Sequence, residues 1–145
     1  MDKEKIKNFA RQLLGCTCPD EVFENIEYRA SFRLSSGQVV NSRINIGNRL
    51  LIYIIKSDDP GFIEKILPLL FSAGKKEKDS SGFNRFRLVI LTDKVDDIKC
   101  LVQKMFDTIK LEDEKIHLHV IDKKDELLLY DDPEELPGFH PVKKV

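Results

Sequence analysis

The sequence predicts an α/β domain with a single mixed β-sheet, in which N-terminal helices and an antiparallel three-strand meander precede parallel β-α-β-α-β units. Two observations lead to this fold class. Early in the chain, two runs of alternating apolar and polar residues flank the short turn Ser35-Ser36-Gly37, which is typical of a hairpin. Later, three apolar runs are separated by segments of helical periodicity, which favours parallel strands joined by helical crossovers.

The chain length favours one domain over residues 1–145, because domains commonly contain about 100–150 residues. The last residues, 131–145, form a tail rich in proline and acidic side chains that has little of its own to fold around.

The first element expected is an amphipathic helix over residues 3–14, ended by Gly15. Its apolar side chains recur at helical spacing and are Ile6, Phe9, Ala10, Leu13 and Leu14. A second short helix is expected over residues 19–25, with Cys18 at the N-cap and Pro19 at the first helical position.

Three strands are expected next, at residues 27–34, 39–46 and 50–55. In the first, alternation predicts that four apolar side chains share one buried face: Tyr28, Ala30, Phe32 and Leu34. The third run is apolar at every position, as expected of a central strand that is covered on both faces.

A helix is then predicted to begin at Ser57-Asp58-Asp59-Pro60 and to be kinked or shortened at Pro68. Residues 74–84 are rich in lysine and serine and are expected to form a polar loop. The remaining elements are, in order, a strand at 85–91, a helix that opens at Thr92-Asp93, a strand at 116–121 and a short helix at 123–130.

Charge and cysteine content limit the classes of function. Lys and Arg number 24 against 25 Asp and Glu, so the overall field favours neither nucleic acid nor an anionic membrane as a partner. Three cysteines argue against a closed disulfide framework and favour a reducing, cytoplasmic setting. No signal-peptide pattern opens the sequence, and its longest apolar run is too short to span a membrane. A protein partner stays open.

Cys16 and Cys18 are the leading candidate site. A thiol beside a helix N-terminus has a lowered pKa, because the positive end of the helix dipole favours the thiolate. Two such thiols can exchange a disulfide or hold a soft metal, as zinc or within an iron–sulfur cluster. The alternative is that both are small buried residues packed at a tight corner. Cys100 is expected on the polar face of its helix, as an incidental exposed thiol.

The stretch around this pair reads Leu14-Gly15-Cys16-Thr17-Cys18-Pro19-Asp20-Glu21-Val22-Phe23. It resembles the LGCxCPxEVF signature of a small prokaryotic family whose function is uncharacterised. The resemblance covers this stretch alone and implies no activity.

Acidic residues follow the ends of the three helix-linked strands, at Asp58, Asp93 and Asp122. Ligands of open α/β sheets bind outside the carboxyl ends of the strands, and clustered carboxylates there can hold Mg²⁺. The second functional hypothesis is therefore a non-catalytic binding or scaffold domain with its ligand at this edge. Helix capping is the commoner role for acids at such positions.

His117 and His119 are expected on one face of the last strand. Together with Cys16 and Cys18 they would complete a Cys₂His₂ zinc set, and the alternative is an ordinary hydrated strand edge.

The element order also resembles the core of restriction-endonuclease-like nucleases, which carry an acid, any residue and then lysine on the third strand. The matching stretch here is Ile54-Ile55-Lys56, so the lysine is present and the acid is missing. The resemblance implies at most a degenerate nuclease-like domain. The hairpin's polar face, with Arg29, Arg33 and Arg43, can meet phosphates, but such a face is more often solvated or covered, here by the first helix.

Overall fold

Five strands form one mixed sheet in the order β1-β2-β3-β4-β5 in the computed structural model, which describes residues 3–13, 19–34, 37–109 and 115–125. The strands are β1 (Ile26–Arg33), β2 (Val39–Ile46), β3 (Leu50–Lys56), β4 (Arg85–Thr92) and β5 (Ile116–Asp122). The first three pair antiparallel, whereas β3, β4 and β5 pair parallel. The predicted fold class is confirmed, and so is the parallel arrangement of the three later strands.

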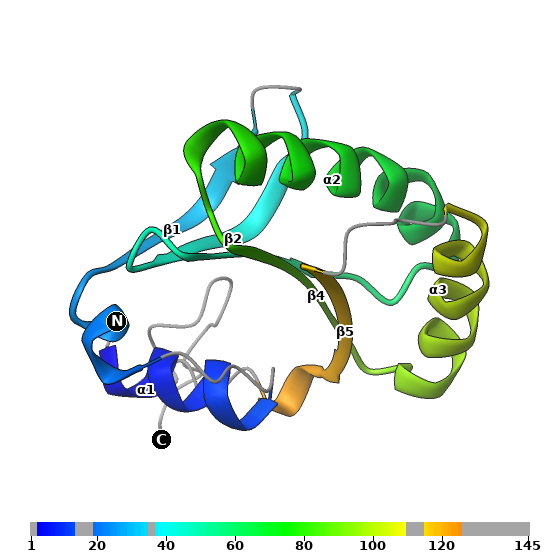
Figure 1. Ribbon diagram of the computed structural model, residues 1–145. Helices are drawn as coiled ribbons and strands as arrows, with labels where there is room; N and C mark the ends of the chain where they lie inside the picture. Colours follow the sequence, from blue (N-terminus) through cyan, green and yellow to red (C-terminus); the bar gives the residue numbers. More distant parts are fainter. Residues whose placement is uncertain (1–2, 14–18, 35–36, 110–114, 126–145) are drawn as a thin grey trace, which may run out of the picture.

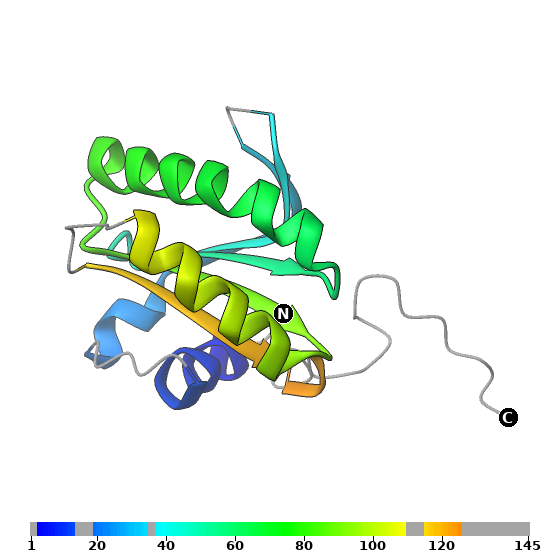
Figure 2. The same cartoon turned by 90° about the vertical axis from the view of Figure 1, so that its right-hand side faces the viewer.

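Helices cover both faces of this sheet (Figures 1 and 2). On one, here called the helix face, lie α2 (Pro60–Ser81) and α3 (Val95–Ile109). On the other, the N-terminal face, lie α1 (Lys3–Asn8), the π-helical turn η1 (Phe9–Leu13) and the 3-10 helix η2 (Asp20–Glu24). None of the described helices is long and apolar enough to cross a bilayer.

Strand β3 supplies apolar side chains to both faces. Ile52 and Ile54 join the cluster under the N-terminal segments, and Tyr53 and Ile55 join the cluster under α2 and α3. All four are at most 2% exposed. This placement explains why the run is apolar at every position, since successive strand residues point to opposite faces.

The loop expected over residues 74–84 is wrong for most of this range, because α2 continues to Ser81. Gly74 allows α2 to lie directly on β4: a Cβ atom there would lie 2.2 Å from ring carbons of Phe86. The helix ends at Gly82, which has a φ of 75° and whose N–H donates to the Lys78 carbonyl. Gly74 therefore marks a close approach of helix and sheet rather than the end of the helix.

Pro68 lies inside α2 and does not shorten it. The proline removes one helical N–H, so a carbonyl one turn earlier loses its usual partner. Pro68 is exposed, which leaves this carbonyl on the side of the helix that water can reach. The predicted shortening of the helix is therefore wrong.

Strand β1 does not keep one buried face, contrary to the alternation in its sequence. Tyr28 packs on the N-terminal face, but Phe32 and Leu34 pack with the cluster under α2. Between them, Ser31 has a φ of +50°, and the register passes from Ala30 to Phe32 without it. A left-handed residue changes the direction of the strand, and the end of the hairpin rises toward α2 (Figure 1).

The N-terminal helices differ in type from those predicted. The first helix is α-helical only to Asn8 and continues as a π turn to Leu13. The second is a 3-10 helix whose N-cap is Pro19, not Cys18, which lies outside the described residues. Of the helix predicted at 123–130, residues 123–125 form a 3-10 turn, and the remainder, like the 131–145 tail, lies outside the described residues.

Candidate functional site

Cys16 and Cys18 lie outside the described residues, but both flanking segments are described. The Asp20 carboxylate, just after the pair, binds two side chains that come before it. Its Oδ1 lies 3.0 Å from Lys7 Nζ and 2.8 Å from Arg11 Nη2. Hydrogen bonds from Lys7 and Arg11, followed by their charges, lower the pKa of Asp20. We call these three residues the ionic clasp.

The ionic clasp stands over an aromatic ring. The Phe23 ring centroid lies 5.0 Å from the Arg11 guanidinium carbon and 6.0 Å from Lys7 Nζ. Phe23 is itself buried in the N-terminal face of the sheet. The segment before the cysteine pair and the segment after it are therefore bound to each other and packed on the sheet.

The segment after the pair is also held by the β2–β3 turn. The Gly47 N–H donates to the Asn25 carbonyl over 2.7 Å. Gly47 has a φ of +60°, and a Cβ atom there would lie 2.5 Å from the Val22 carbonyl oxygen. Glycine is suited to this position because it tolerates the positive φ and has no Cβ to clash with Val22. The β2–β3 turn and η2 therefore pack as one unit.

At the opposite end of the sheet, the three predicted strand-end acids do not share one role. Asp58 Oδ1 accepts hydrogen bonds from Thr92 Oγ1 and from the Asp93 N–H, each over 2.8 Å. Its Oδ2 accepts from Lys123 Nζ over 2.9 Å. The Asp93 N–H, then Lys123 and Thr92, lower the pKa of Asp58 to about 2. Asp58 thus joins the carboxyl ends of the three parallel strands.

The capping role expected of these acids is only partly observed. Asp59 accepts from the Gly61 N–H over 2.9 Å and caps α2. Asp122 accepts from the Lys124 N–H over 3.0 Å and closes the turn after β5. Before α3, the Thr92 hydroxyl oxygen accepts from the Lys94 N–H over 3.1 Å and forms a turn.

A lysine side chain lies beside the acids at this end of the sheet. The Lys123 ammonium lies 2.9 Å from Asp58 and 3.8 Å from Asp93, so the protein supplies the positive charge itself. Across the described ranges, no group of three or more His, Cys, Asp or Glu side chains is placed to hold a metal ion. The geometry therefore favours a structural role for Asp58.

His117 and His119 project from β5 beside Arg87 of β4. Arg87 Nη1 lies 2.9 Å from His119 Nε2, and because a guanidinium can only donate, Nε2 is the acceptor. Burial and then the charge of Arg87 lower the pKa of His119 to about 4, and burial lowers that of His117. His119 is thus neutral at pH 7, but the nitrogen facing β4 is already bonded, which does not favour the Cys₂His₂ zinc set.

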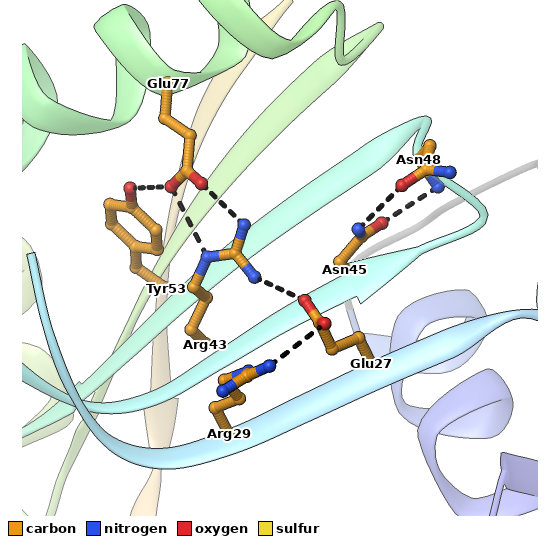
Figure 3. A network of polar contacts seen from close by, with 7 residues as sticks. All are labelled: Glu27, Arg29, Arg43, Asn45, Asn48, Tyr53 and Glu77. Carbon is orange, nitrogen blue, oxygen red and sulfur yellow. Dashed lines mark hydrogen bonds and ion pairs between the residues drawn. The ribbon is translucent and has the colours of Figure 1, made fainter.

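A buried polar network under α2 was missed by the sequence reasoning (Figure 3). Arg43 is 7% exposed, and its Nη2 donates to Glu77 Oε2 over 2.5 Å. Its Nη1 donates to Glu27 Oε1 over 3.0 Å, and the Tyr53 hydroxyl donates to Glu77. Burial opposes the charge on Arg43, but the bonds to Glu77 and Glu27 outweigh it and raise the arginine pKa.

Arg43 had been expected on a solvated face or under the first helix, and α2 covers it instead. Arg43 lies directly opposite Tyr53 in the β2–β3 register, which alternation could have indicated. Its acidic partner could not be found, because Glu77 falls in the segment predicted as a loop. Burial, followed by the bond to Glu77, raises the pKa of Tyr53.

The likeness to nucleases is confined to element order. Ile54, at the position of the nuclease acid, is 1% exposed and belongs to the core. The backbone N–H of Lys56 donates to Asn41 Oδ1 over 2.8 Å. Comparison of the chain with protein-family models, curated proteins and solved structures finds no match.

Proposed function

We propose that this protein is a thiol module in which Cys16 and Cys18 exchange with a disulfide or hold a soft metal. The observation that carries the proposal is the ionic clasp, which fastens the chain before the pair to the chain after it. Because both ends of the segment are held, we expect its two thiols, which are one residue apart in the sequence, to stay within reach of each other. Two thiols within reach of each other favour both disulfide closure and bidentate metal binding.

The clasp also supplies positive charge near the pair in sequence. Lys7 and Arg11 each carry one positive charge, and the Asp20 carboxylate balances one of the two. The Glu4 carboxylate is exposed and lies 3.9 Å from Lys7, so it reduces this positive charge only weakly. Cations stabilise the thiolate relative to the thiol and so lower a cysteine pKa. We assign thiol activation to these side chains, because η2 has only five residues and Pro19 at its N-cap offers no N–H.

The exchange reaction needs a disulfide as its co-reactant. One thiolate of the pair attacks a sulfur of that disulfide, and the other sulfur leaves as a thiolate. The second cysteine then attacks the mixed disulfide and releases the remaining thiolate. The pair is oxidised by two electrons and the partner is reduced by two. In the metal-handling form, the two thiolates bind zinc or part of an iron–sulfur cluster instead.

Alkylation with iodoacetamide across a pH series, read by peptide mass spectrometry, tests the proposal, with exposed Cys100 as the internal control. At least one cysteine of the pair should react with a midpoint below about 8.5, the ordinary thiol pKa. Arg11→Gln should move that midpoint upward. Metal analysis of anaerobically purified protein distinguishes the two forms. If both cysteines alkylate more slowly than Cys100 and no metal is bound, the pair only packs and the proposal is wrong.

A ligand-binding role at the strand-end acids has less support, because both oxygens of Asp58 are already engaged. A reducing cytoplasm is the setting that the thiol module requires, since free thiols persist there. Membership of the LGCxCPxEVF family is part of the same proposal.

A further inference from the structure

A cavity of about 290 Å³ opens between the end of β1 and the second half of α2. One wall is apolar and includes Phe32, Leu34 and Ala73. The other wall is polar and includes Lys76, Glu77 and Ser80. Lys76 and Glu77 lie four and three positions before Ser80, so each shares a side of α2 with it. Ligand pockets usually start at about 300 Å³, so this space suits one small molecule.

Glu77 joins this cavity to the buried network of Figure 3. Its side chain is 25% exposed, and the Tyr53 ring also lines the cavity. Glu77 Oε1 accepts from Arg43 Nε and from the Tyr53 hydroxyl, whereas Oε2 accepts only from Arg43 Nη2 among the described residues. A carboxylate oxygen has two lone pairs, so Oε2 can take a further donor.

The neighbouring side chains provide the opposite chemistry. Lys76 is exposed and carries a positive charge, and the Ser80 hydroxyl is one helical turn further along. Both can donate to an anion. The cavity thus presents an acceptor, a cation with a hydroxyl, and an apolar wall within one small space.

We propose that this cavity binds a small zwitterion with an apolar side chain, which is the chemistry of a free apolar amino acid. The ligand's ammonium donates to Glu77, and its carboxylate accepts from Lys76 and Ser80. Its side chain packs against Phe32, Leu34 and Ala73. The Arg43 guanidinium, 5.1 Å from the Phe32 ring, holds both Phe32 and Glu77 in place for this ligand.

Titration of the full chain with L-phenylalanine, followed by amide chemical shifts, tests the proposal. The shifts should move at Phe32 and along residues 73–81 and should saturate. Two matched analogues separate the charges: 3-phenylpropionate lacks the ammonium, and 2-phenylethylamine lacks the carboxylate. Each should bind at least about tenfold more weakly, as expected for loss of one charged hydrogen bond. If either analogue binds as tightly, the ligand class is wrong.

Variants then locate the site. Lys76→Ala should weaken phenylalanine binding about tenfold, whereas Lys75→Ala, which alters a neighbouring lysine that pairs with Asp79 outside the cavity, should not. Ala73→Leu should fill the space and abolish binding while the circular dichroism spectrum is unchanged. Absence of saturable shifts at millimolar phenylalanine, or unchanged binding by Ala73→Leu, would overturn the proposal. Cys16→Ser should bind normally, so this test is independent of the thiol chemistry.

Discussion

Lys123 donates to Asp58 over 2.9 Å, although the two residues are 65 positions apart in the chain. Asp58 follows β3 and Lys123 follows β5, so the bond passes across the end of the intervening strand β4. The same carboxylate binds the hydroxyl of Thr92 and the N–H of Asp93 at the end of β4. One acidic side chain therefore connects three parallel strands at their carboxyl ends, where a ligand had been expected.

We expect Asp58→Asn to lower the free energy of unfolding, because the amide loses the charge-assisted bond to Lys123. Lys123→Met should lower it as well, and the double variant should cost less than the sum of the two. A urea-denaturation double-mutant cycle measures this coupling. Additive effects would mean that the two side chains do not interact in solution. Mg²⁺ should leave the amide shifts of Asp58, Asp93 and Asp122 unchanged, and a joint shift would reinstate the cation site.

His119 should make the fold less stable as pH falls from 6.5 toward 4. Its pKa in the folded state is lowered to about 4 from an ordinary value of 6.5, so the unfolded chain binds the proton first. Stability is complete above pH 6.5 and decreases through this window. The loss should reach about 2–3 kcal/mol, after allowance for the partial exposure of the ring.

Urea denaturation at pH 7 and pH 4.5 measures that loss. His119→Gln keeps an acceptor for Arg87 but cannot titrate, so it should flatten the pH dependence over this range. His117→Gln is the matched control and should flatten it less, because Arg87 donates to His119 and, among the described residues, not to His117. Equal slopes for wild type and His119→Gln would contradict the expectation.

Gly74→Ala should destabilise the protein by about 1–3 kcal/mol, as overpacking in a core does. The added methyl group would lie 2.2 Å from the Phe86 ring, and this clash outweighs the gain of about 1 kcal/mol in helix propensity. Gly61→Ala is the control in the same helix, since its nearest neighbour would be Asp59 Oδ1 at 3.4 Å. Thermal unfolding of both variants checks this, and a stabilised Gly74→Ala would show that α2 does not lie so close to β4.

Arg43→Met should cost about 2–3 kcal/mol, because it leaves Glu77 and Glu27 without their shared cation. The cost is below the value of about 3–5 kcal/mol for fully buried pairs, since Glu77 is still partly hydrated. Arg29→Met removes a neighbouring arginine that is 59% exposed and 3.4 Å from Glu27, and it should change stability little. Equal costs for these two variants in chemical denaturation would place Arg43 outside a buried network.

Local patterns in the sequence were sufficient for the sheet. Alternation predicted the hairpin partner over residues 39–46, and the unbroken apolar run at 50–55 predicted a central strand. The parallel order of β3, β4 and β5 followed from the helices between them, because a crossover of this length returns the chain in the same direction. These inferences succeed because residues that are close in sequence decide them.

The candidate sites were less accessible to the same reasoning. The acids at the strand ends were expected to gather, and Asp58 does bind the Asp93 backbone. The roles differed, because Lys123 arrives from a distant part of the chain and satisfies the charge. The helix that covers Arg43 was also missed, because its partner Glu77 lies in the segment that was expected to form a loop.

The sequence by itself therefore determined which segments become strands, their relative directions and the burial of β3 on both faces, since these depend on local periodicity and on connection length. The tertiary structure decided how far α2 extends past Gly74, to which face Phe32 turns after Ser31, and whether Asp58 and Arg43 meet water or protein. The physical reason is that burial of a polar group, and the space available to a glycine, depend on the element packed against it. That element is often tens of residues away, and its identity is settled only when the layers assemble.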